Sequence, residues 1–576
     1  MSEEKRKIPR KGKIIGLIIG VIVIAAIAVS AYLFLSDSNL EVPGDYRTIQ
    51  DAIEAAEDGD IIIVEPGVYY EQIDFMGKDI TVRSIDPEDP AVVAETVIDG
   101  RKRGSVVTFK SGESAEAVLQ GFTITNGVGT EQVVSHQYEG SDLTNEGTYG
   151  GGIFISESSS PTITQNVIKD NAVDMDGGGI AIFYGSNPAI SNNTFENNSA
   201  SNGGGISVWD ASPIIENNLL RENRASNMGG GVTVDYQSAP RVSGNEIEEN
   251  SATSGGGIAV WYSEPLLTGN TILENHAIWF GGGIVVMDGT PTIDGNDISR
   301  NTAENNGGGI AVAESAAPEI RNNSIAKNYT TENGGGIAVV EDSTPVITDN
   351  FIADNVVLYG GGGIYINESS PVIDGNNITG NLVEQDGGGI AVLNGSSPTV
   401  QNNIIDENVA GRAGGGLAIG GESEVELQQN TIAGNVANSG GGLFIQNAVV
   451  LVVENDLARN IAQGEGGSGG GIIIVQQSTV EVRKNTFTGN TAQEFGGGLV
   501  SFDESVIVLS GNDFVDNVAE MGGAYIVFGD SVLEISEPDD NTYSGNVPED
   551  TEGGAKERTP EEPEGEPVED LEGSGE

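Results

Sequence analysis

Hydrophobic and polar residues alternate in short runs through most of the chain. Three glycines are followed by apolar-x-apolar, as in the stretches ISV (206–208) and IAV (258–260). A Ser-x-Pro or related turn and an x-Ile pair often come next, and then the hexapeptide Asn-x-apolar-x-x-Asn. A period of two, bounded by Gly, Pro and Asn, is typical of short strands. Each unit therefore predicts three short strands separated by three corners.

The unit returns at an almost constant interval of 26 or 27 residues, with one of 29. It is too short for a propeller blade and contains no helical stretch. Strands that return to register in this way describe one coil of a parallel β-helix, and fifteen coils stacked at ~4.8 Å make a rod ~70 Å long. The sequence predicts an all-β, single-stranded parallel β-helix of fifteen coils over residues 150–547. The glycine triplets begin at residues 150, 177, 203, 229, 255, 281, 307, 334, 361, 387, 414, 440, 469 and 496, with a Gly-Gly-Ala variant at 522.

The repeated residue types have physical roles in such a coil. Alternation directs Ile206 and Val208 into the core and Ser207 and Trp209 outward. The glycines are expected at a corner that needs a positive φ or a close approach of two backbones. The asparagines are expected to stack in a ladder whose amides satisfy backbone groups at the corners. Examples of that ladder are Asn223, Asn250 and Asn275.

Residues 37–149 precede the first triplet and predict an N-terminal cap followed by the first coils. Thr48 and Asp51 form a capping-box pattern, and apolar residues at 49, 52, 53 and 56 follow helical spacing. We expect this helix to cover the open edge of the first coil. The stretches DIIIVEPG, KDITVRSID and ETVIDG each predict a short strand.

The two ends of the chain differ from the repeat. Residues 1–13 carry six Lys and Arg, and residues 14–35 are 22 uncharged, mostly apolar residues, which is long enough to span a bilayer. The basic cluster predicts a cytoplasmic amino terminus and a single-pass membrane anchor that places the β-helix on the extracytoplasmic side. The alternative is a signal peptide cleaved near Ala31. Residues 548–576 are rich in Pro, Glu and Gly and predict a disordered acidic tail.

The composition limits the partners and metal sites that can be expected. The formal net charge is −60, which disfavours nucleic acid as a partner and polyuronates without a bridging cation. There is no Cys, and the two histidines are His136 and His276, so zinc or copper sites lack ligands. The carboxylates allow diffuse Ca²⁺ binding, and no other metal or cofactor is expected.

The organisation resembles the right-handed parallel β-helix proteins of the pectin-lyase-like superfamily. The opening YRTIQDAIEAAEDGDIIIVEPGVYYE and the stretch LQGFTITNG resemble that family, and the Gly-Gly-Gly-Ile and Phe/Ile-x-x-Asn elements resemble repeats of chlamydial polymorphic outer-membrane proteins. The resemblance covers roughly residues 41–547 and implies right-handed coiling. It does not imply an activity, because the Gly-His-Gly, Gln-Asp-Thr-Leu and Asp-Pro-His elements of enzymes in this superfamily are absent. No catalytic residue is assigned.

Large aromatic and acidic residues concentrate directly after the triplet strands of the second to sixth coils. Aligning the repeats brings Trp209 and Trp261 into one column, two coils and ~10 Å apart. Aromatic rings at positions expected to face solvent suit the C–H faces of sugars, while carboxylates accept hydroxyl hydrogen bonds. The candidate glycan-binding residues are Tyr184, Trp209, Asp210, Asp235, Tyr236, Trp261, Tyr262, Trp279 and Asp288.

Two alternatives stay open. The aromatic residues either contact a glycan or partner, or they pack on one another or beneath the long segment 127–148. The functional hypothesis is a membrane-anchored, non-catalytic surface adhesin or glycan-binding stalk. A polysaccharide lyase or glycoside hydrolase that uses a pair of carboxylates on the same face is the alternative.

Overall fold

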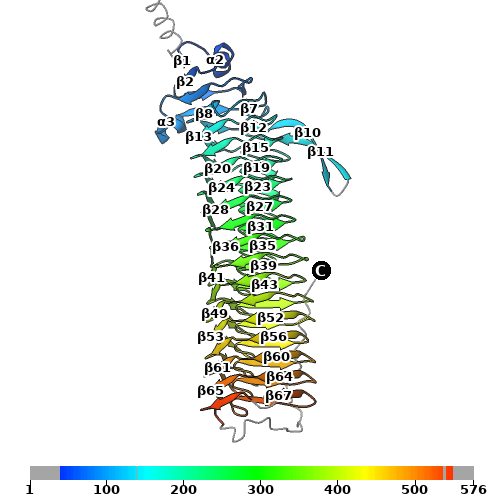
Figure 1. The fold of residues 1–576 in the computed structure, drawn as a ribbon. Helices are drawn as coiled ribbons and strands as arrows, with labels where there is room; N and C mark the ends of the chain where they lie inside the picture. Colours follow the sequence, from blue (N-terminus) through cyan, green and yellow to red (C-terminus); the bar gives the residue numbers. More distant parts are fainter. Residues whose placement is uncertain (1–38, 139–140, 536–539, 549–576) are drawn as a thin grey trace, which may run out of the picture.

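The computed structural model describes residues 39–138, 141–535 and 540–548. The chain winds into one long rod of stacked coils, with β1 (Asn39–Val42) at one end and β67 (Val532–Ile535) at the other (Figure 1). The predicted anchor at 14–35, the cleavage site near Ala31 and all but the first residue of the predicted tail lie outside the described residues. Within the described ranges, none of the helices has the length and apolar composition of a membrane span.

Four parallel sheets run along the rod in the part of the chain that the structure describes. Sheet 1, whose strands from β12 onward each follow a glycine triplet or the Gly-Gly-Ala variant, has 17 strands there. Sheet 2 has 19 strands, from β1 to β67. Sheet 3 has 18, from β3 (Gly67–Tyr69) to β68 (Thr542–Ser544), and sheet 4 has 12, from β18 (Ser199–Asn202) to β62 (Thr491–Ala492). The strands of sheet 1 are β4 (Ile73–Asp74), β7 (Val107–Phe109), β12 (Ile153–Ile155), β15 (Ile180–Phe183), β19 (Ile206–Trp209), β23 (Val232–Asp235), β27 (Ile258–Trp261), β31 (Ile284–Met287), β35 (Ile310–Ala313), β39 (Ile337–Val339), β43 (Ile364–Asn367), β47 (Ile390–Leu393), β51 (Leu417–Ile419), β55 (Leu443–Gln446), β59 (Ile472–Val475), β63 (Leu499–Ser501) and β66 (Tyr525–Val527).

One coil illustrates the path of the chain through the four sheets. It consists of β19, β20 (Ile214–Glu216), β21 (Leu219–Arg221) and β22 (Arg224–Met228). Like positions of successive coils pair, so Ile206 lies beside Val232 in parallel register. The β-helix is therefore confirmed, but the prediction of three strands per coil is wrong for many coils. The segment after the second asparagine of the hexapeptide also pairs with its neighbour, which adds the short strands of sheet 4.

The core follows the predicted alternation. Ile206 and Val208 of sheet 1, Ile215 of sheet 2 and Leu220 of sheet 3 are all fully buried. One hydrophobic cluster connects such residues from Val42 to Tyr525. Complete burial of an aliphatic side chain stabilises a fold by roughly 1.5–3 kcal/mol, so this continuous core supplies the main driving force for coiling.

The outer face of sheet 1 is also largely buried, which the alternation does not predict. Ser207 is 2% exposed although it points away from the core. The segment before each triplet folds back over the strand that follows, so a Cβ on Gly203 would lie 2.8 Å from Cβ of Ser207. In the next coil the Thr233 hydroxyl donates to the carbonyl oxygen of Met228 at 2.8 Å. This close cover explains why the middle outward position of sheet 1 is most often Ala, Ser or Thr.

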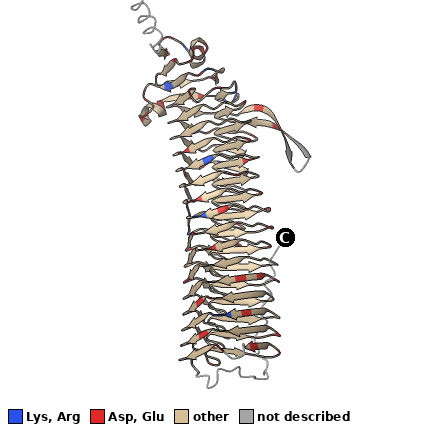
Figure 2. Ribbon diagram, viewed as in Figure 1, with Lys and Arg blue, Asp and Glu red and all other residues tan. Residues whose placement is uncertain are grey.

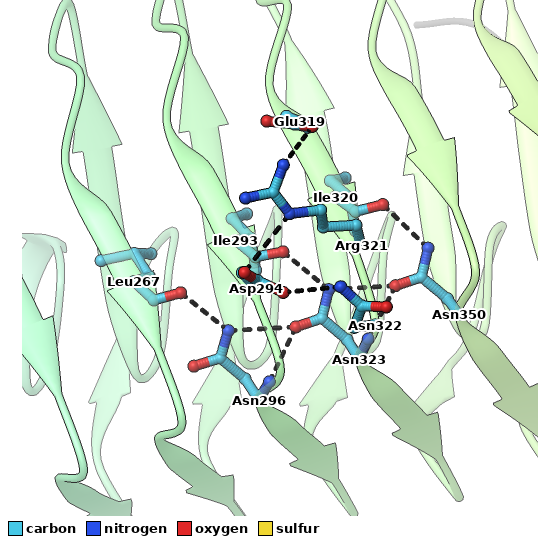
Figure 3. Close-up of polar contacts among 10 residues, drawn as sticks. All are labelled: Leu267, Ile293, Asp294, Asn296, Glu319, Ile320, Arg321, Asn322, Asn323 and Asn350. Carbon is cyan, nitrogen blue, oxygen red and sulfur yellow. Dashed lines mark hydrogen bonds and ion pairs between the residues drawn. The ribbon is translucent and has the colours of Figure 1, made fainter.

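Two asparagine ladders follow the corners on either side of sheet 3. In Figure 3 the Nδ2 of Asn296 donates to Oδ1 of Asn323 at 3.0 Å and to the carbonyl oxygen of Leu267 at 2.9 Å. Asn323 repeats this pattern with Oδ1 of Asn350 at 3.0 Å and the carbonyl oxygen of Ile293 at 2.8 Å. The predicted ladder of Asn223, Asn250 and Asn275 has the same geometry and is confirmed. Each amide therefore satisfies buried corner groups that the strands leave unpaired.

The glycine triplets show both features for which glycine was predicted, a positive φ and a close approach of two backbones. Gly203 has a φ of 63°, in the left-handed region. At Gly204 a Cβ would lie 2.6 Å from the carbonyl oxygen of Gly230 in the next coil, a distance that no side chain tolerates. The triplet thus turns the chain and lets successive coils approach closely.

The predicted N-terminal helix is present as α2 (Ile49–Ala55). The Thr48 hydroxyl accepts a hydrogen bond from the backbone N–H of Asp51 at 3.0 Å, which is the predicted N-cap. The buried face of α2 packs against β1 and β2 (Ile61–Val64) at the N-terminal end of the stack (Figure 1). The sequence did not indicate a second short helix, α3 (Pro90–Glu95), which begins after the N-cap Asp89.

Candidate functional site

The residues that directly follow the sheet 1 strands form one line along the rod, here called the corner file. In the second to sixth repeat coils this file consists of Tyr184, Asp210, Tyr236, Tyr262 and Asp288. Each takes a left-handed backbone conformation, with φ between 46° and 53°, at the turn from sheet 1 toward sheet 2. The parallel register of sheet 1 supplies one such residue per coil, so their spacing is about 4.8 Å.

Two of the three tyrosines of the corner file are exposed, and Tyr236 between them is partly buried. Tyr184 is 39% exposed and Tyr262 is 38% exposed. The ring centroids of Tyr236 and Tyr262 are 6.3 Å apart, with planes inclined by 41°. Aromatic rings and the carboxylates of Asp210 and Asp288 therefore share one edge of the rod, and the structure brings five of the nine predicted site residues together there.

Three more predicted residues lie one position earlier, at the ends of the strands. Trp209 pairs with Asp235, and Asp235 pairs with Trp261. The two tryptophans therefore lie on the same side of the molecule, two coils apart, as the alignment of the repeats predicts. Asp235 occupies the coil between them.

Trp209 is not on the solvent-facing surface, and the prediction that it faces water is wrong. The side chain is only 6% exposed. It belongs to a cluster with Phe183, Val134 and Tyr149. The last two come from a β-hairpin of β10 (Thr130–Tyr138) and β11 (Ser141–Tyr149), which leaves the rod as a projecting arm (Figure 1).

The alternative of packing beneath the segment 127–148 is thus confirmed for Trp209. The segment is not irregular, since nine residues of each strand pair in antiparallel register. Trp261, which lies two coils beyond Trp209, is only partly buried. The base of the hairpin therefore separates a packed part of the aromatic face from an open part.

Trp279 does not join the corner file. It precedes the triplet at Gly281, at the opposite end of β31, and is 55% exposed. Its ring contacts Phe280 edge-on, with centroids 6.5 Å apart. The sequence placed it among the candidates because of its residue type, whereas the turn of the coil separates it from the other eight.

Two buried carboxyl groups lie against the aromatic face. Asp235 is 9% exposed. Burial raises its pKa well above 3.8, the nearby Asp176 raises it further, and a hydrogen bond with the backbone of Tyr236 lowers it. Burial also raises the pKa of Asp176 to about 6, against a lowering hydrogen bond that the Nδ2 of Asn202 donates to its Oδ1 at 2.8 Å. Neither carboxylate forms an ion pair within the described part of the chain.

Sequence reasoning named Asp235 but missed Asp176. Asp176 directly precedes a glycine triplet, where an aspartate is indistinguishable from an ordinary turn residue. Its alignment with Asn202 and Met228 in the following coils is the signal that places it over the outer face of sheet 1.

Charge along the rod is mainly negative. Asp and Glu recur from end to end, and Lys and Arg are sparse (Figure 2). Across residues 39–138, 141–535 and 540–548, no group of three or more His, Cys, Asp or Glu is arranged to hold a metal ion. The corner file between Tyr184 and Asp288 contains no cationic side chain.

Comparison with known proteins gives a family and distant structural likenesses. The family described as "Right handed beta helix region" matches residues 113–298, 267–405 and 402–547. No curated protein sequence matches the chain. Two structures of the PL6 family alginate lyase AlyGC, one of them a mutant, are 12% and 11% identical, with TM-scores of 0.23 and 0.22, and each alignment covers 91% of this chain and 99% of the lyase.

A Siphovirus 9NA tailspike receptor binding domain is 12% identical over 91% of this chain and 78% of that domain, with a TM-score of 0.14. The family match covers well over half of the sequence and coincides with the stacked parallel coils. The chain therefore belongs to the family of proteins with a right-handed β-helix region.

Proposed function

We propose that this protein is a non-catalytic surface adhesin or stalk that binds a glycan along the corner file. The observation that carries the proposal is the order Tyr184, Asp210, Tyr236, Tyr262 and Asp288 on successive coils of one edge. Tyrosine rings offer apolar faces to sugar C–H groups, and the two carboxylates accept hydrogen bonds from hydroxyls. A ligand with its own linear repeat suits this linear arrangement.

The charge of the corner file favours an uncharged glycan. Asp210 and Asp288 interrupt the tyrosines, and the file contains no Lys or Arg in these coils. An anionic polysaccharide would meet two carboxylates and the field of a chain with a net charge of −60. A neutral polysaccharide avoids both of these electrostatic repulsions.

We infer from the sequence that residues 14–35 anchor the protein in the cell membrane and that the β-helix extends on the extracytoplasmic side. The apolar length of this run and its basic flank support the inference. The helix α2 would then shield the membrane-proximal end of the coil stack, because it covers β1 and β2. Alkaline extraction of membranes tests the anchor: the full chain should stay in the pellet, and a variant without residues 14–35 should be released.

The glycan-binding proposal is tested with the purified full-length chain and immobilised neutral and acidic polysaccharides. Tyr262→Ala should reduce binding to a neutral polysaccharide at least tenfold. Tyr329→Ala is the matched control, because Tyr329 is equally exposed, at 38%, but lies on β38 (Tyr329–Thr330) of sheet 4. Equal binding by both variants and the unmodified chain would refute the role of the corner file.

A second function, hydrolysis of a glycan, is favoured by one specific observation. Asp235 is a buried carboxyl group in the coil between those of Trp209 and Trp261, and its raised pKa suits a general acid. Asp176 supplies the second carboxyl group that such a reaction needs. The test is release of reducing ends from a neutral polysaccharide. If the unmodified chain releases them and Asp235→Asn abolishes the release but retains binding, the protein is a glycoside hydrolase and the proposal of a non-catalytic adhesin is wrong.

A further inference from the structure

The corner file continues toward the C-terminal end of the rod and there borders a groove. The groove has a volume of about 740 Å³. Its lining comes from the turns that follow β51, β55, β59, β63 and β66, five consecutive coils of sheet 1. The residues that line it are Glu422, Asn447, Gln476, Gln477, Asp503, Glu504, Gly529 and Asp530.

The polar walls of the groove are held in place by contacts between coils. The Nε2 of Gln477 donates to a carboxylate oxygen of Glu504 at 3.0 Å. The backbone N–H of Gln477 donates to the carbonyl oxygen of Asp503 at 2.8 Å. Gln446, at the end of β55, donates from Nε2 to Oε1 of Gln476 at 2.6 Å. Amide and carboxylate groups are therefore oriented before any ligand arrives.

One end of the groove is open because the corner residue there is a glycine. Gly529 has a φ of 63°, and a Cβ built on it would meet no atom within 4 Å. The equivalent corner residues one and two coils earlier, Asp503 and Gln476, adopt the same left-handed conformation with side chains. A side chain at position 529 would therefore have room, opposed only by the left-handed φ, and its absence leaves space in the groove.

Two partly exposed phenylalanines directly precede these turns, and a third, Phe495, reaches one of them from the segment before the glycine triplet at Gly496. Phe502 directly precedes Asp503, and Phe528 directly precedes Gly529. The rings of Phe502 and Phe528 are parallel, with centroids 4.9 Å apart, and Phe495 meets Phe528 edge-on at 4.9 Å. None of the three rings is fully buried, so an apolar shelf borders the polar groove.

The geometry points to a second binding site, for a neutral saccharide, in this groove and on the phenylalanine shelf. The lining contains carboxylate and amide side chains, and both kinds of group bind sugar hydroxyls. Carboxylates accept hydrogen bonds from hydroxyls, whereas amides both donate hydrogen bonds to them and accept hydrogen bonds from them. The lining has no Lys or Arg, which disfavours uronic acids and other anions. A bound metal ion is not supported, because the part of the chain that the structure describes holds no suitable group of three ligands.

This inference shares its ligand class with the proposed function but rests on different residues. Asn447 in the groove lies seven coils from Tyr262 along the corner file, or about 34 Å at the strand spacing. A long polysaccharide that follows the rod would reach both sites, and the second contact would raise its apparent affinity above that of a short oligosaccharide.

The test uses full-length protein and hexasaccharides of β-1,4-glucan, β-1,3-glucan and β-1,4-mannan, with hexagalacturonate as the anionic probe. Gly529→Gln fills the groove and should weaken binding of a neutral hexasaccharide at least tenfold when combined with Tyr262→Ala. Gly269→Gln is the matched control, because Gly269 also has a left-handed φ, of 62°, and open space around its Cβ position, at a corner between sheets 2 and 3. Glu504→Gln provides a second variant, with the shape of the groove retained.

The outcomes separate the two proposals. Residual binding in Tyr262→Ala that disappears when Gly529→Gln is added supports the second site. Complete loss of binding in Tyr262→Ala alone, or equal affinity with and without Gly529→Gln, overturns the second site and leaves the corner file intact. Binding unaffected by Tyr262→Ala but lost in Gly529→Gln overturns the proposed function alone. Tighter binding of hexagalacturonate than of every neutral probe, or no binding of any probe, refutes the second site.

Discussion

The indole ring of Trp209 stacks on the phenol ring of Tyr236 in the next coil, with centroids 5.1 Å apart and planes inclined by only 9°. This contact joins a buried residue to the accessible corner file, since Trp209 is 6% exposed and Tyr262, one coil further, is 38% exposed. One aromatic face thus contains both residues that pack and residues proposed to bind a ligand. Substitution of the first kind should lower stability, and substitution of the second kind should lower binding.

Trp209→Ala should lower the free energy of unfolding by about 3–5 kcal/mol, because it leaves a cavity between the hairpin and sheet 1. Tyr262→Ala should cost less than about 1 kcal/mol, because Tyr262 lies at the exposed edge of the rod and its removal leaves no enclosed cavity. Thermal unfolding followed by circular dichroism measures both. Equal melting temperatures for the two variants would show that the hairpin does not stabilise this region.

The buried carboxyl group of Asp176 should make stability depend on pH. Its pKa is 3.8 in a model peptide and about 6 in the folded chain, so the folded state binds the proton more tightly. The destabilising effect of its ionisation is absent below about pH 4, grows as the pH rises through this window, and is complete above about pH 6.

Asp176→Asn should therefore raise the free energy of unfolding at pH 7.5 by up to about 3 kcal/mol and leave it almost unchanged at pH 3.5. An asparagine fits the position, because the next coil carries Asn202 there. The Oδ1 of Asn202 accepts a hydrogen bond from Nδ2 of Asn227, just as Oδ1 of Asp176 accepts one from Nδ2 of Asn202. Melting temperatures at the two pH values provide the measurement, with the exposed Asp210→Asn as control. A gain that is the same at both pH values would contradict the ionisation account.

The asparagine ladder should be sensitive to single substitutions. Asn250→Ala removes the oxygen that accepts from both the backbone N–H and the Nδ2 of Asn223, each at 3.0 Å, and the amide that donates to the carbonyl oxygen of Leu220 at 2.9 Å. Several buried polar groups would lose their partners, at about 1–3 kcal/mol each. Urea unfolding should show a loss of more than about 3 kcal/mol, whereas Asn187→Ala at the exposed surface should cost less than about 1 kcal/mol. Comparable losses in both variants would mean that burial of the ladder does not matter.

Alanine should be tolerated at one glycine of the β-helix and not at another. At Gly204 a Cβ would lie 2.6 Å from the carbonyl oxygen of Gly230, so Gly204→Ala must separate two coils. At Gly269 the space is open, and only the left-handed φ opposes alanine, at about 1–2 kcal/mol. We expect soluble expression and native circular dichroism from Gly269→Ala and loss of folded protein from Gly204→Ala. A folded Gly204→Ala variant with unchanged melting temperature would disprove the close approach.

The features that repeat with the coil could be predicted from the order of residues alone. The inward positions of Ile206 and Val208, the ladder through Asn250 and the vertical alignment of Trp209 with Trp261 all follow from one period, because stacking identical units places like residues in parallel register. The N-cap at Thr48 was also predictable, since a capping box is a local signal.

The features that join segments without a shared period depend on how the folded chain packs. The β10–β11 hairpin buries Trp209, the chain before each triplet covers the outer face of sheet 1, and Asp176 lies near Asp235 although 59 residues separate them. The groove beside Phe502 and Phe528 likewise arises from five successive turns that differ in residue type. Alternation specifies which side of a strand a residue occupies, but burial and pKa depend on what else packs against that side, and this is set by contacts between segments distant in the chain.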